Sequence, residues 1–212
     1  MITRQTALFD YVDKVLAAYL LLMLRKFRKM QNNLLSFDEL NAINTQASVN
    51  STYADVLALA MEAFRKVARA YYRKVRRDED FPLDMWLADL LNGYDPVTYY
   101  LFYPEHDRKR ARMFESALAS RTRADLKKEV TKAYKYWGRQ FKHYLDKVAV
   151  NAVLEAYKAE GITLFEWVTQ KDEKVCAECA PKDGQLYTQK ELPPLPLHYN
   201  CRCFIIPHEP KK

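Results

Sequence analysis

The 212-residue chain has only four glycines and four cysteines, and long stretches of it contain no proline. Because glycine and proline interrupt helices, their scarcity predicts a mainly helical protein. Long hydrophobic runs are missing too: the most apolar one, Val15 to Leu24, has ten residues, whereas a membrane-spanning helix needs about 20. We therefore expect a buried helix there and no membrane association. No small-residue cleavage site follows the run, so we expect synthesis in a reducing cytosol, where structural disulfides are rare.

Motifs of several large enzyme classes are also missing. The chain has no GxxxxGK phosphate loop, no GxSxG elbow and no HExxH helix, which argues against common nucleotide hydrolases, α/β-hydrolases and zinc proteases. His106, His143 and His208 stand apart from one another and are interpreted as surface residues. We expect no enzymatic activity; a thiol oxidoreductase or hydrolase centred on the cysteines is the enzyme hypothesis that stays open.

Apolar residues recur at three- and four-residue steps through most of the chain, which is the periodicity of amphipathic helices. Capping and stop signals help to set their ends, with a capping box at 36–39 and a stop at Gly161. We predict helices at about 7–30, from 36 onward, and at 53–77, 82–93, 105–119 and 122–160.

After Gly161 the sequence becomes rich in β-branched and aromatic residues, which favour strands. We predict a strand that runs into a turn within 162–175, a turn at Asp183-Gly184 with a short strand to Thr188, and a last strand at 201–206. The predicted fold is mainly α: a helical body over 1–160, followed by a small β-module over 161–212, which makes it α+β overall.

Positive charge is concentrated in the helical part. Residues 1–160 carry 27 Lys and Arg against 20 Asp and Glu, while residues 161–212 carry 7 of each. On two predicted helices the basic residues share one sector, an arrangement that can follow DNA phosphates without reading sequence. The alternative is a solvated helix face. The candidate DNA-binding residues are Arg65, Lys66, Arg69, Arg73, Arg76 and Arg77 on one helix, and Lys128, Lys132, Lys135, Arg139 and Lys142 on the other.

All four cysteines lie close together near the C-terminus, with one histidine beside them. Cys176-x-x-Cys179 precedes His198-x-x-Cys201-x-Cys203 by a connector, and this spacing suits one structural zinc ion. A β-module of this size buries too little surface to be stable alone, and zinc supplies the missing free energy. Five candidate ligands compete for four places, and the spare one is left open. Two disulfides, a redox pair and free thiols are the alternatives.

This stretch resembles the C-terminal signature of the phage head-morphogenesis family, the minor head proteins similar to protein F of phage Mu. The resemblance covers about residues 161–207. Many members place a proline after the histidine where this chain has Tyr199. The motif is Trp167-x-Thr169-x-x-Asp172-x-x-Val175-Cys176-x-x-Cys179-x-x-x-Asp183-Gly184, a proline-rich connector, and His198-x-x-Cys201-Arg202-Cys203.

The resemblance implies a minor protein inside the head of a tailed phage, assembled in the host cytoplasm. Its implied partners are the portal protein, the major capsid or scaffold protein, and double-stranded DNA bound without sequence preference. Within the module we expect Trp167 to pack in the core and Asp183-Gly184 to set the turn. A zinc-dependent nucleic-acid-binding protein without a role in the virion is the alternative function.

Overall fold

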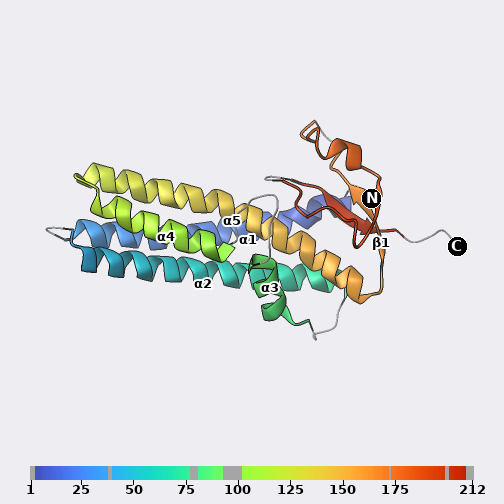
Figure 1. Cartoon of the computed structure of the whole chain (residues 1–212), viewed down its shortest axis with the longest axis horizontal. Coiled ribbons are helices and arrows are strands. Elements are labelled where there is room, and N and C mark those ends of the chain that lie inside the picture. The colour runs from blue at the N-terminus through green and yellow to red at the C-terminus, as the bar shows by residue number, and fades with distance from the viewer. Residues whose placement is uncertain are drawn as a thin grey trace. The chain divides into compact units, whose positions relative to one another are not determined.

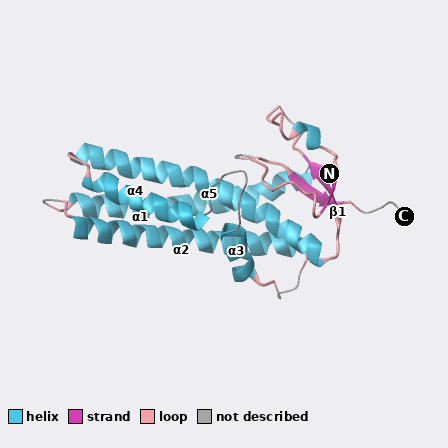
Figure 2. Cartoon of the chain, viewed as in Figure 1, coloured by secondary structure: helices cyan, strands magenta, loops and turns pink. Residues whose placement is uncertain are grey.

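A computed structural model describes residues 3–37, 40–76, 81–92, 102–171, 173–198 and 201–208, with side chains from residue 10 onward. Helices fill most of these segments before residue 160, and the strands follow (Figure 2). The prediction of a helical body followed by a small sheet is therefore confirmed. The elements, of which α1 to α5 and β1 are labelled in Figure 1, are α1 (Thr3–Leu35), α2 (Ala42–Val75), α3 (Leu83–Asn92), α4 (Phe102–Leu118), α5 (Arg123–Ala159), β1 (Leu164–Val168), the 3-10 turn η1 (Ala180–Lys182), β2 (Leu186–Thr188) and β3 (Phe204–Pro207).

Local sequence signals set both ends of α5. The Thr122 hydroxyl accepts a hydrogen bond from the Asp125 amide at 3.0 Å, while the Asp125 carboxylate accepts one from the Thr122 amide at 3.1 Å. This reciprocal pair is a capping box. At the other end Gly161 has a φ of 77°, and the Ile162 amide donates to the Tyr157 carbonyl at 3.0 Å. That 6→1 bond closes a Schellman motif, in which glycine takes the left-handed position without strain.

The prediction of separate helices from 36 onward and at 53–77 is wrong. A single helix, α2, covers both stretches and begins at Ala42. The Asn41 side chain accepts a hydrogen bond from the Asn44 amide at 2.8 Å and so caps the first turn. The Ser36 hydroxyl instead donates to the Asn33 carbonyl at the end of α1. The other part of the proposed capping box, 38–39, lies outside the described residues.

The chain divides into two compact units, and the first comprises residues 1–64 and 100–145. Its core is aromatic. Tyr53, Phe64, Phe102, Trp137 and Phe141 are at most 1% exposed, and their rings meet edge-on or tilted, with the Phe64 and Phe102 centroids 5.1 Å apart. Such contacts add about 0.5–1.5 kcal/mol per pair to the hydrophobic burial.

Two histidines that we interpreted as surface residues are buried. His106 is 5% exposed and His143 3%. The Nε2 atom of His106 lies 2.8 Å from the Tyr53 carbonyl oxygen, and its ring lies against that of Trp137 at 5.6 Å between centroids. The sequence interpretation failed because a lone polar residue on a mostly apolar helix face carries no signal of the neighbour that will satisfy it.

The second unit comprises residues 65–99 and 146–212. Its sheet has the order β2-β1-β3 with both pairs antiparallel, so that Glu166 pairs with Leu186 on one side and Ile206 on the other. One face of the sheet shares a hydrophobic cluster with Val150 and Leu154 of α5. The Asn151 amide also donates to the Leu195 carbonyl at 2.6 Å.

The change from helix to strand occurs near the predicted 160/161 boundary, but the compact unit reaches back into α5. A three-stranded sheet needs a partner for its apolar face, and Val150 and Leu154 supply part of it. The division into domains at 160/161 stays a prediction. Among the described residues, no helix is long and apolar enough to cross a membrane.

Candidate metal centre

Two tight turns bring the cysteines and the histidine together within the second unit. The first is Cys176-x-x-Cys179, where the amides of Cys179 and Ala180 both donate to the Cys176 carbonyl, at 3.1 and 2.9 Å. The second is His198-x-x-Cys201, where the Cys201 amide donates to the His198 carbonyl at 3.1 Å. Each turn places two donor side chains a short distance apart.

The donor atoms from the two turns converge. His198 Nε2 lies 3.0 Å from Cys176 Sγ and 3.1 Å from Cys179 Sγ, and Cys179 Sγ lies 3.8 Å from Cys201 Sγ. Two groups of donors emerge, each with all its atoms within 4.8 Å of one another: Cys176, Cys179 and His198, and Cys179, Cys201 and Cys203. All five predicted ligands thus come together, and Cys179 belongs to both groups.

The geometry and chemistry of these donors fit a metal ion. Metal–sulfur bonds of about 2.3 Å in a tetrahedron place sulfur atoms about 3.8 Å apart, which is the separation of Cys179 and Cys201. A disulfide needs sulfur atoms about 2.05 Å apart, and all four cysteines are free thiols in the structure. The cavity between the donors measures about 20 Å³, room for one water molecule or one ion.

The thiols of this cluster do not ionise alike. The Cys203 thiol donates a hydrogen bond to Cys201 and thereby lowers the pKa of Cys201 to about 5, and the same bond raises the pKa of Cys203. Desolvation by burial raises the pKa of Cys179 to about 12. For Cys176, desolvation by burial acts to raise the pKa. Hydrogen bonds from the Cys179 amide and thiol outweigh this effect, so that the pKa of Cys176 is lowered. Binding of a cation would displace the protons that the crowded thiols retain.

The residues expected to support the module lie around the cluster. Trp167 is fully buried and shares the hydrophobic cluster with Cys179, Cys201 and Cys203. The Asp183 carboxylate accepts hydrogen bonds from the Thr169 amide at 2.8 Å and its hydroxyl at 3.0 Å. The Gly184 amide, at a φ of 75°, donates to the Trp167 carbonyl. These bonds connect the turn that follows Cys179 to the end of β1.

The candidate DNA-binding residues of α2 have several roles inside the second unit. Arg65 forms an ion pair with Asp84 at 2.7 Å. Arg76 donates to the Ala159 carbonyl at 2.6 Å and lies 3.7 Å from Glu160. Arg77 lies outside the described residues. The exposed members of the set are Lys66, Arg69 and Arg73.

On α5, in the first unit, pairing is likewise uneven. Lys132 pairs with Glu129 at 2.5 Å, and Lys142 pairs with Asp13 at 3.3 Å. The side chains of Lys128, Lys135 and Arg139 are exposed. Glu129 lies three residues before Lys132 and could have been found from helical spacing, whereas Asp13 lies on α1, where no periodicity along α5 reveals it.

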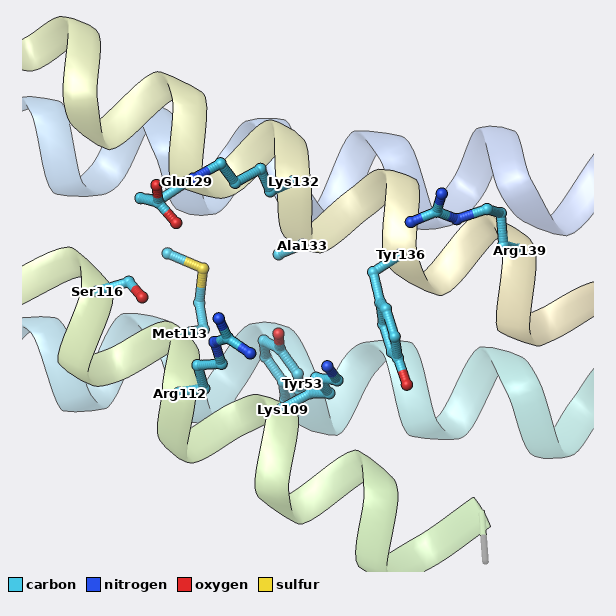
Figure 3. A pocket seen from close by; sticks show the side chains of 10 residues that line it. All are labelled: Tyr53, Lys109, Arg112, Met113, Ser116, Glu129, Lys132, Ala133, Tyr136 and Arg139. Carbon is cyan, nitrogen blue, oxygen red and sulfur yellow. Dashed lines mark hydrogen bonds and ion pairs between the residues drawn. The ribbon is translucent and has the colours of Figure 1, made fainter. Parts of the chain in front are cut away.

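The sequence reasoning missed Lys109 and Arg112 on α4, which lie near the basic residues of α5 at a pocket between the two helices (Figure 3). The available signal was the run of residues 108–112, where four of five positions are Lys or Arg.

Comparison with known proteins bears directly on this region. No curated protein and no solved structure matches the chain. Residues 122–206 match the family model described as Phage Mu protein F like protein. The match begins at the residue that caps α5 and ends in β3, so it includes the whole helix and all five converging donors. The resemblance predicted from the cysteine signature is therefore confirmed over residues 122–206, which match the phage Mu protein F like model.

Proposed function

We propose that this protein is a non-enzymatic minor head protein of a tailed phage, which acts in head morphogenesis and in DNA packaging or ejection. The observation that carries the proposal is the family match over 122–206. The matched region coincides with α5 and the strands around the converging donors. The match therefore covers a complete helix and the strands, and does not rest on the cysteine pattern alone.

The ion that we propose for the cluster is zinc. Thiolate and imidazole ligands in a tetrahedral arrangement favour zinc over hard cations such as Mg²⁺ or Ca²⁺. Cys179, Cys201 and Cys203 are buried, and the five donors outnumber the four positions of a tetrahedral ion. With its positions filled by protein, the ion would serve a structural role, with no place for a reactive water.

We further propose that the protein sits inside the head, docks on the portal protein or the inner capsid surface, and contacts double-stranded DNA without sequence preference. The exposed Arg69, Lys128 and Lys135 support contact with phosphates. The ion pairs of Arg65 and Lys142 with acidic neighbours reduce what those two residues contribute.

The test is co-sedimentation of the full chain with the portal protein, and separately with capsid shells, from the same genome, with and without DNA, at low and high salt. Binding to the portal that persists at high salt and without DNA is the expected result. A protein that ignores portal and capsid shells under all conditions would refute the role in the head.

Two other functions predict different outcomes. A zinc-dependent nucleic-acid-binding protein without a role in the virion would bind DNA with a steep salt dependence and leave the portal alone; the exposed basic residues are the observation in its favour. A thiol enzyme would carry a reactive thiol and no stoichiometric metal. One zinc ion per chain would exclude that enzyme.

A further inference from the structure

A pocket of about 230 Å³ lies within the first unit, between α4 and α5, with Tyr53 of α2 also lining it. Figure 3 shows Lys109 and Arg112 of α4 on either side of Tyr53, and Lys132 and Arg139 on the ribbon of α5. The site contains none of the cysteines. It is a separate feature of the molecule, to which neither the family match nor the proposed metal assigns a role.

The sequence explains why space remains between the two helices. The lining residues recur at steps of three and four on both, so they face each other across the interface. Ser116 and Ala133 hold two of these positions. Their short side chains leave unfilled the volume that a leucine would occupy in a packed interface.

Four cationic side chains and one carboxylate line the pocket. Glu129, the carboxylate, already pairs with Lys132 at 2.5 Å. Within the described segments, neither Arg112 nor Arg139 forms an ion pair with a carboxylate. Two guanidinium groups therefore border the cavity with their hydrogen-bond donors available, and guanidinium pairs strongly with phosphate through two parallel bonds.

Two of the lining residues, Lys109 and Tyr136, are held in place by contacts with the buried Glu105. The Glu105 side chain is fully buried; it accepts a hydrogen bond from the Tyr136 hydroxyl and pairs with Arg108 at 2.5 Å. The Lys109 ammonium lies 3.7 Å from the centre of the Tyr136 ring and 3.7 Å from Glu105. These contacts orient Lys109 before any ligand arrives, so little side-chain entropy is lost on binding.

Lys109 also shows the effect of the surrounding positive charge. Desolvation lowers its pKa, and repulsion from Arg108 and Arg112 acts in the same direction, against the attraction of Glu105. An anion in the pocket would offset that repulsion. The Tyr53 and Tyr136 rings supply an apolar wall beside the cations, which suits the carbon part of a phosphate ester.

We propose that this pocket binds a phosphate group, with Arg112 and Arg139 as its principal ligands and Lys109 as a further fixed charge in its lining. The phosphate can belong to a free anion or to the backbone of DNA. If the phosphate belongs to DNA, the inference rests on the proposed DNA contact. If it belongs to a free anion, the inference is independent of that contact.

The experiment measures binding to the full-length protein of two probes: inorganic pyrophosphate by calorimetry and a short DNA duplex by fluorescence anisotropy. The variants are Arg112→Gln and Arg139→Gln. Arg123→Gln is the matched control, because Arg123 is an exposed arginine on the same helix as Arg139 and does not line the pocket. Thermal unfolding of each variant shows whether its fold is intact.

We expect each pocket variant to lose about tenfold in affinity, since a hydrogen bond to a charged group contributes that much or more, while Arg123→Gln stays within about twofold of wild type. Loss with pyrophosphate assigns the site to a free phosphate anion, and loss with the duplex alone assigns it to the DNA backbone. The proposal is overturned if wild type binds neither probe, or if the pocket variants bind both as tightly as Arg123→Gln. Because no portal protein takes part, failure here is distinct from failure of the proposed role in the head.

Discussion

Replacing Cys179 by serine should disrupt the metal centre more than any other single substitution in it. Cys179 is the one donor that belongs to both groups of converging side chains, so every set of four built around either complete group includes it. Structural zinc contributes about 10–16 kcal/mol of apparent binding free energy through four ligands, or about 3 kcal/mol per ligand. That corresponds to roughly a hundredfold loss of zinc affinity.

The assay is a competition titration of the full chain against a zinc chelator, with metal content measured on the purified protein. Thermal unfolding with and without chelator then reports the stability that the ion supplies. We expect one zinc ion per wild-type chain and a lower unfolding temperature after chelation. A wild-type protein that is fully folded without metal, or a Cys179→Ser variant that retains wild-type zinc affinity, would show that the cluster is not a structural zinc site.

A histidine pair supplies the matched control for this prediction. His198→Ala removes the Nε2 atom that lies 3.0 Å from Cys176 Sγ, and should weaken zinc binding. His208→Ala changes a histidine outside both donor groups and leaves intact the hydrogen bond from its backbone amide to Leu164. Equal losses in the two variants would mean that His198 is not a ligand. Among Cys176→Ser, Cys201→Ser and Cys203→Ser, a variant with nearly unchanged affinity would identify the spare donor.

Two further predictions concern stability. Asp183→Ala should lower the free energy of unfolding at neutral pH by about 1–3 kcal/mol, because it removes the acceptor of two hydrogen bonds from Thr169. Hydrogen bonding from the Thr169 amide lowers the pKa of Asp183, so the stability that Asp183 contributes is present above the unfolded-state pKa of about 3.9 and is lost as the pH falls through the lowered folded-state pKa. Urea unfolding of wild type and variant at several pH values checks this. A difference in unfolding free energy between the two that grows in acid would contradict it. Thr122→Ala should lower the free energy of unfolding by about 1 kcal/mol through loss of the α5 cap, as measured by urea unfolding. The control is Thr131→Ala, because the Thr131 hydroxyl donates to the Lys127 carbonyl within the helix and caps nothing. Equal losses in the two variants would mean that the cap contributes nothing.

Helix periodicity predicted most of the fold, because an apolar stripe at steps of three and four has few ways to be buried. The stripe of α5 from Leu126 to Val148 is buried at positions such as Trp137 and Phe141. Gly161 ended the helix as predicted, since a left-handed residue there is favourable mainly for glycine. The start of α2 was mispredicted because Ser36 and Asn41 are both good capping residues, and local sequence does not decide between two neighbouring caps.

Charge patterns gave less reliable information than apolar ones. Arg65 and Lys132 looked equivalent to Arg69 and Lys135 by spacing, yet Asp84 and Glu129 neutralise the first two. Asp84 comes from a different helix, so no periodicity along α2 could have revealed it. The buried His106 is a similar case, because its partner is a backbone carbonyl of α2.

The sequence by itself determined the helical body, the strands after Gly161 and the five candidate metal donors, because each depends on residue type and short-range spacing. Only the tertiary structure decided that all five donors converge and that Cys179 is common to both groups. It also decided that the end of α5 completes the core of the sheet, and that short side chains on α4 and α5 leave a basic pocket. These features depend on distances between segments far apart in the chain, which are fixed by packing and not by any local pattern.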